Sequence, residues 1–151
     1  MINRDVKFWD SVAFHPEVAP FVFMECEKQS LSPLIKNECN EPFASDNGGV
    51  LFVKTDHLGS IYEMHTLFTP EGWGREVATT GAKALHHIFS KALLVFTYEQ
   101  EGHWQSRPPK SHRWKSSGEF VDQGLSKRLK LWYLTRDDWL SSPVGKKIRC
   151  P

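Results

Sequence analysis

The stretch that decides the fold runs from Thr66 to Phe89 and reads "TLFTPEGWGREVATTGAKALHHIF". It begins as a strand, breaks at Pro70, turns through Gly72 and Gly74, and continues with apolar residues at helical spacing. The first turn of a helix has unpaired backbone N–H groups and a partial positive charge, so it can hold an anion when no side chain blocks the approach. Two glycines remove such side chains. The stretch therefore predicts either a plain strand-to-helix turn or a place where main chain meets a phosphate.

The segments on either side of this stretch predict a sheet. Two β-rich runs, Val50 to Thr55 and Ser60 to Phe68, are separated by "DHLG", in which Asp56 and Gly59 are typical of a hairpin turn. After the helix, the apolar run Ala92 to Tyr98 indicates a buried strand. A strand–helix–strand connection of this length joins neighbouring strands, so we expect the second and third runs side by side with the helix packed over them.

The two ends of the chain are less regular. Apolar residues at three- and four-residue steps predict a short helix over residues 6–14, whereas residues 28–48 read as an irregular connection with one further short helix. "RPPKSHRWKSSGEFVDQG", residues 107–124, looks like a proline-opened helix ending at Gly118, and Leu129 to Thr135 supplies a last strand. With no repeat or linker, residues 1–151 are expected to form one domain.

Composition limits the protein classes that are possible. The chain has 151 residues, 40% of them hydrophobic, which suits a domain with its own core. No run approaches the roughly 18 to 20 apolar residues of a membrane span, and "MINRDVKFWD" lacks the apolar core of a signal peptide, so we expect a cytoplasmic protein with no membrane partner. The three cysteines and seven histidines have no metal-ligand spacing, which favours a reduced compartment and no metal.

Charge is distributed unevenly along the chain. Residues 1–102 carry 8 Lys and Arg against 14 Asp and Glu, and residues 103–151 carry 11 against 4. The basic third suits the phosphates of a ligand, an acidic partner or a plain solvated face. No nucleic-acid-binding motif accompanies it, so nucleic acid is not an expected partner.

The segment "PEGWGREVATTGAKALHHIFSKALLVFTYE", residues 70–99, resembles the acetyl-CoA pyrophosphate loop, helix and following strand of the Gcn5-related N-acetyltransferases. The order of elements is similar over residues 6–139. The resemblance implies an α/β (α+β) fold with a mixed, mostly antiparallel twisted sheet and helices on both faces. It also implies acyl transfer from acetyl-CoA to an amine acceptor.

The resemblance assigns the cofactor site to the start of the central helix. Main-chain N–H groups at Gly72, Trp73, Gly74 and Arg75 would hold the pyrophosphate. The strand end just before them, at Leu67 and Phe68, would pair with the pantetheine arm.

A base for the amine is expected on the strand before the loop, because many members of the family carry a carboxylate there. Glu63 and His65 are two residues apart on that strand and so project to the same face. Either would serve as the base if partly buried. The alternative is an ordinary polar, solvated face.

Several positions depart from the family pattern, which reads Gln/Arg-x-x-Gly-x-Gly/Ala at the loop. Aligned on the helix, Glu71 takes the first position, Gly74 the fourth and Glu76 the sixth. Glu76 would then stand where the pyrophosphate approaches and would repel it. This departure weighs against cofactor binding at the loop.

The family's general acid is a Tyr on a later helix, preceded by an Asn. Here Trp114 takes the Tyr position and Arg107 the Asn position. Trp has no acidic proton to give a leaving thiolate, so Trp114 reads as a core or groove-lining aromatic. Tyr98 and Tyr133 are the possible substitutes.

A second function stays open on these departures. "FHPEVAPFV", residues 14–22, also resembles the N-terminal segment of phage-encoded members. The chain would then be a catalytically degenerate protein with a structural role in head assembly or the virion, its partners being phage structural proteins. Fold alone does not decide between the two functions.

Overall fold

Six strands form one sheet in the order β1-β2-β3-β4-β6-β5. The computed structural model describes residues 1–24, 26–55, 59–103, 107–122 and 127–149. Neighbouring strands run antiparallel except β3 and β4, which are parallel. The strands are β1 (Glu41–Ser45), β2 (Gly48–Lys54), β3 (Ile61–Phe68), β4 (Leu94–Gln100), β5 (Lys115–Asp122) and β6 (Lys127–Thr135). The predicted mixed, mostly antiparallel sheet and the side-by-side second and third strands are confirmed.

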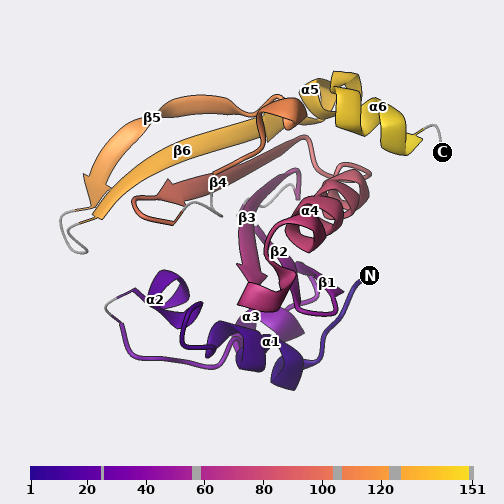
Figure 1. Ribbon diagram of the computed structural model, residues 1–151. Coiled ribbons are helices and arrows are strands. Elements are labelled where there is room, and N and C mark those ends of the chain that lie inside the picture. Colours follow the sequence, from indigo (N-terminus) through magenta and orange to yellow (C-terminus); the bar gives the residue numbers. More distant parts are fainter. Residues whose placement is uncertain (25, 56–58, 104–106, 123–126, 150–151) are drawn as a thin grey trace.

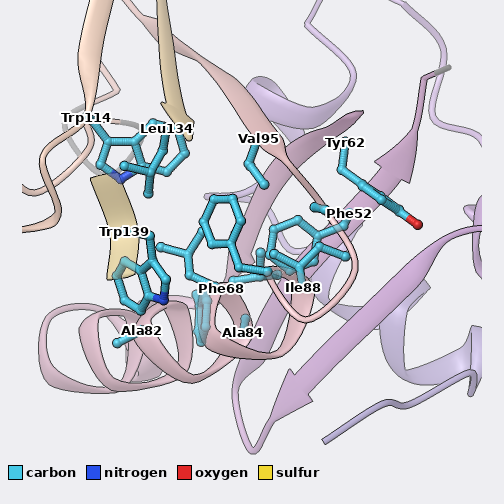
Figure 2. Close-up of a cluster of buried hydrophobic side chains, with 14 residues drawn as sticks. Phe52, Tyr62, Phe68, Ala82, Ala84, Ile88, Val95, Trp114, Leu134 and Trp139 are labelled. Atoms are coloured by element: carbon cyan, nitrogen blue, oxygen red, sulfur yellow. The ribbon is translucent and has the colours of Figure 1, made fainter. Parts of the chain in front are cut away.

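The central helix α4 (Arg75–Ile88) covers one face of the sheet (Figure 1). Its apolar stripe, with Ala84, Leu85 and Ile88 almost fully buried, packs on Val50 and Phe52 of β2. Figure 2 shows the same cluster continuing to the C-terminal part of the chain. Burying this stripe is what fixes the helix on the sheet, because a helix of 14 residues is marginal alone in water.

Residues of opposite parity on the strands face the other side. Leu51 of β2 and Leu67 of β3 pack with Trp9 and Val12 of the first helix and with Ile35. The helices on this face are α1 (Val6–Ala13), α2 (Ala19–Val22) and α3 (Ser32–Lys36), grouped together below the sheet in Figure 1. The expected helices on both faces, and the expected helix over residues 6–14, are therefore present.

Residues 28–48 contain more order than predicted. Besides the one expected short helix, α3, they hold β1, which the prediction missed. Pro42 sits in this strand, and it is tolerated because β1 is at the edge of the sheet. Glu41, also in β1, lies 3.1 Å from His87 Nε2 of α4 and accepts from Lys91 Nζ just after the helix, so it ties the strand to the C-terminal end of α4.

The predicted helix ending at Gly118 is wrong. Residues Lys110–His112 form a single 3-10 turn, η3, and the chain then enters β5, the far edge strand, which pairs with β6 along its length. Nearly all of β5 is exposed, so its sequence carries no alternating apolar signal. Gly118, read as the end of a helix, lies at a bulge of this strand with φ +124°.

The chain ends in two short helices that the sequence did not indicate. They are α5 (Arg136–Ser141) and α6 (Pro143–Arg149), and they lie beside α4 in Figure 1. Trp139 of α5 is fully buried and joins the α4 core. The predicted hairpin turn at Asp56 falls partly outside the described residues, although the two strands that it would join pair as expected.

Candidate active site

The parallel strands β3 and β4 separate halfway along the sheet. They pair only from Ile61 to Glu63, although β3 continues to Phe68. Thr97 Oγ1 donates to Met64 O at 2.8 Å where the pairing stops. Two cavities lie at this split, and Met64, Thr66 and Val77 line both of them. The split thus links the two faces of the sheet.

The larger cavity, about 710 Å³, lies on the α1–α3 side. Glu63 and His65 both line it, and the 3.4 Å between His65 Nε2 and Glu63 Oε1 confirms that they share a face. Glu63 is the more buried, its side chain 25% exposed against 44% for His65. The two residues are thus a hydrogen-bonded pair in a cavity wall rather than a fully solvated polar face.

The charge state of this wall follows from its contacts. The hydrogen bond with His65 lowers the pKa of Glu63 below its ordinary value, outweighing the opposing effect of burial. Tyr98 of β4 lines the same cavity, and burial together with the nearby Glu63 charge raises its pKa. At neutral pH the wall therefore holds an ionised carboxylate beside a protonated phenol. Tyr133, the other candidate phenol, lines neither cavity.

The two glycines of the opening motif have different roles. Gly72 is packed inside the protein, because a Cβ there would lie 2.9 Å from the Phe68 ring and 3.0 Å from Asn47 Cβ. Gly74 is the N-cap of α4, has φ +89°, and has open space where a Cβ would be. Gly72 thus permits the turn, whereas Gly74 keeps the helix entrance clear.

Fewer backbone N–H groups are available to bind an anion at the start of α4 than the sequence predicts. The N–H of Gly72 donates to Thr69 O at 2.9 Å and that of Trp73 to Pro70 O at 3.2 Å, inside the 3-10 turn η1 (Pro70–Gly72). Among the residues that the structure describes, no side chain caps the start of α4. Candidate donors for an anion are therefore at Gly74, Arg75 and the residues that follow, because the first turn of a helix lacks internal acceptors.

Glu76 does not stand in this entrance as predicted. Its carboxylate accepts from Ser45 Oγ at 2.6 Å, Asn47 N at 2.9 Å and Asn47 Nδ2 at 2.8 Å. Burial raises the pKa of Glu76, but these hydrogen bonds outweigh it and the pKa lies below its ordinary value. The side chain is thus committed to the β1–β2 turn and fixes α4 against it.

The strand end that was expected to pair with pantetheine is partly occupied. Leu67 and Phe68 are both buried, and Trp73 Nε1 donates to Phe68 O at 3.0 Å. Trp73 also lines the larger cavity. It therefore acts as a side-chain brace between the end of β3 and α4, a role that the sequence did not indicate.

The smaller cavity, about 210 Å³, runs along the start of α4. The helix presents small residues to it, namely Gly74, Ala78 and Gly81, and the opposite wall comes from the segment before β5. That wall includes Arg107, His112 and Trp114. Trp114 is both a core residue and groove-lining, as expected, although it follows a 3-10 turn instead of lying in a helix.

His112 is the residue of this wall that sequence reasoning missed. It is 6% exposed, stands edge-on to Trp139 with ring centroids 5.3 Å apart, and its Nδ1 is buried with no hydrogen-bond partner among the described residues. Burial lowers the pKa of His112. The spacing of residues in the sequence could not reveal that His112 is buried, because the residues around it come from α5 and from the turn itself.

The comparisons with known proteins concern the fold of the chain. The sequence matches no protein-family model and no curated protein. In structure the chain is similar to spermidine N-acetyltransferase SpeG from Vibrio cholerae in complex with CoA and spermine, with a TM-score of 0.67 at 14% identity over 93% of this chain and 95% of that one. A point mutant of the same enzyme gives 0.66 at 17% identity over 93% and 95%. A putative acetyltransferase from T. thermophilus gives 0.58 at 13% over 80% and 70%.

These likenesses define the class: the chain has the Gcn5-related N-acetyltransferase fold that its sequence resembles. None of the three structures named above is described as a phage or virion protein, so the phage resemblance gains no support from them.

Among the described residues, no helix is long and apolar enough to cross a membrane. Within the same residues, no three His, Cys, Asp or Glu side chains are grouped to hold a metal ion.

Proposed function

We propose that this chain transfers an acyl group from acetyl-CoA to an amine. The observation that carries the proposal is the split between β3 and β4, which connects a cavity at the uncapped start of α4 with a cavity that contains an ionised carboxylate. Neighbours with this fold include an enzyme solved with CoA and spermine. Acetyl-CoA would supply the activated acyl thioester.

The smaller cavity suits the diphosphate of acetyl-CoA. The open Cβ direction at Gly74, the missing side-chain cap and the small residues along α4 let a diphosphate reach the helix N–H groups. Arg75 begins the helix and Arg107 faces it across the cavity, so both would add positive charge. With Glu76 bound to the β1–β2 turn, its carboxylate is directed at protein donors instead of at the ligand.

The larger cavity fits the amine. Glu63, kept ionised, would pair with the incoming ammonium group, and His65 beside it would take the proton that the nitrogen must lose before attack. Tyr98, kept protonated, would donate to the sulfur that leaves when the carbon–sulfur bond breaks. Holding the two reactants across the split supplies the proximity that this chemistry needs.

Calorimetry with acetyl-CoA and a thiol-release assay with a panel of amines test the proposal. Tyr98→Phe removes the phenol without changing shape and should lower kcat by about 100-fold or more, with KM for acetyl-CoA retained. Tyr133→Phe is the matched control and should keep wild-type kcat, because that residue lines neither cavity. Absence of acetyl-CoA binding up to millimolar concentration would refute acyl transfer.

The structural phage role stays as the alternative from sequence. No described feature of the site favours it, and the same calorimetry distinguishes the two: a scaffold that has lost the chemistry has no reason to bind acetyl-CoA.

A further inference from the structure

The larger cavity is mostly apolar. Its volume of about 710 Å³ is in the range of small-molecule sites. Its walls come from both the sheet and the connection after α1. Apolar side chains that line it include Phe21, Phe23, Met24, Leu34, Leu67 and Phe68.

The Asp, Glu, Lys and Arg side chains that line this cavity carry charge of one sign only. Of the lining residues that the structure describes, the Asp, Glu, Lys and Arg members are Glu17, Glu27 and Glu63, all acidic. Glu17 and Glu27 are exposed, whereas Glu63 lies in the wall and pairs with His65. Lys127 stands over the Phe21 ring at 5.9 Å from its centroid but is not a lining residue. The interior therefore offers one partly buried carboxylate among apolar walls.

This combination selects among amines. One ammonium group beside Glu63 is paired, and an alkyl or aromatic body gains by leaving water for the apolar walls. A second or third ammonium group in the same ligand would be brought against apolar side chains without a partner, which disfavours binding. The acidic residues at Glu17 and Glu27 are too exposed to offset this, since surface ion pairs contribute little.

We infer that the acceptor is a monoamine on an apolar body, with its ammonium group beside Glu63 and its body against Phe21, Phe23 and Leu67. The inference rests on the proposed acyl transfer for its biological meaning, but the binding site itself is testable without turnover. It differs from what the name of the neighbour solved with spermine suggests, because spermine is a polyamine.

Three probes separate the contribution of the ammonium group from that of the apolar body. They are phenethylamine, phenethyl alcohol and spermidine. Each is titrated calorimetrically into the free protein and into the protein saturated with CoA, which cannot donate an acyl group. Phenethylamine is expected to bind at least about 10-fold more tightly than either of the others, because the alcohol lacks the ammonium group and spermidine lacks the apolar body.

Glu63→Gln and Glu27→Gln are the matched variants. The first should lower phenethylamine affinity about 10-fold, towards that of the alcohol, and the second should change it less than about twofold. Far-UV circular dichroism and the melting temperature check that both variants are folded. Equal losses in the two variants would overturn the placement of the ammonium group.

The remaining outcomes separate this inference from the proposed function. Tighter binding of spermidine, or no binding of phenethylamine in either form, overturns the monoamine inference and leaves acyl transfer standing if acetyl-CoA binds. Binding of phenethylamine without any binding of acetyl-CoA supports the site and refutes acyl transfer.

Discussion

Gly81 shows how a single missing side chain keeps a cavity open. It lies in the middle of α4, lines the smaller cavity, and has open space where a Cβ would be. Gly in a helix interior costs roughly 0.5–1 kcal/mol relative to Ala, so the position gives up helix stability. Retaining space for a ligand is a physical reason for that cost.

We therefore expect a small and a large side chain at position 81 to have different effects on stability and on acetyl-CoA binding. Gly81→Ala should stabilise the fold by about 0.5–1 kcal/mol and keep acetyl-CoA binding. Gly81→Leu should leave the protein folded but weaken acetyl-CoA binding by about 10-fold or more, because the side chain fills the cavity. Urea unfolding and calorimetry measure the two effects. Unchanged affinity in the Leu variant would mean that acetyl-CoA binds elsewhere.

Glu76 is a second residue whose role depends on its contacts. Glu76→Ala leaves the Ser45 hydroxyl and the Asn47 amides without their acceptor and should cost about 1–3 kcal/mol in unfolding free energy. Glu71→Ala, in the preceding turn η1 and exposed, is the control and should have a much smaller effect. Equal losses in urea unfolding would show that the carboxylate does not hold the β1–β2 turn.

At the scale of elements, the turn η3 carries a buried histidine that should make stability depend on pH. Burial lowers the pKa of His112 in the folded protein, whereas the unfolded chain titrates near its ordinary pKa of about 6.5. Between the unfolded and the lower folded pKa, the unfolded state binds more protons. Stability is thus fully present above about pH 7 and falls as pH decreases through that window.

His112→Phe should remove this dependence, because it keeps an aromatic ring beside Trp139 and cannot be protonated. The measurement is urea unfolding of both proteins from about pH 8 to about pH 5.5, a range that spans the ordinary histidine pKa. The stability difference between wild type and variant should change with pH across this range. A constant difference would show that His112 has the same pKa in both states.

At the scale of the whole molecule, ligand binding should increase the free energy of unfolding. The two halves of the sheet are joined at β3 and β4 by three residue pairs, by the Thr97–Met64 hydrogen bond and by hydrogen bonds from Leu93 N and Leu94 N to Ser60 O. A ligand that spans this split binds only the folded state. At 100 times its Kd, acetyl-CoA should therefore stabilise the protein by about 2.7 kcal/mol.

For a chain of this length, that stabilisation corresponds to a Tm increase of roughly 5–11 °C. Differential scanning fluorimetry with acetyl-CoA and, as control, with free adenosine measures it. A shift that is equal for both ligands would argue against a site that extends through the split.

The central part of the fold was predictable because its signals are local. The strands β2 and β3 of the hairpin carry apolar residues either in a continuous run or in alternation, and α4 carries a single apolar stripe. Each of these segments therefore determines its own conformation. Glu63 and His65 share a face for the same reason, namely the two-residue period of a strand. These residues needed no distant partner to be placed correctly.

The sequence-based predictions are wrong where the conformation of a segment depends on the strand with which it pairs. The sequence predicts a helix where β5 lies because an exposed edge strand has no apolar pattern, and only its pairing with β6 makes it a strand. Similarly, β1 depends on its pairing with β2, and its Pro42 argued against a strand. Long-range pairing is invisible to a window of sequence.

By itself, then, the sequence determined that a glycine turn leads from a buried strand into an amphipathic helix, since backbone freedom and hydrophobic period are properties of the segment. Only the tertiary structure decided that Gly74, and not Gly72, keeps the helix entrance open, that Glu76 is bound to Asn47, and that His112 is buried. The physical reason is that contacts, burial and charge are set by what packs against a residue from elsewhere in the chain.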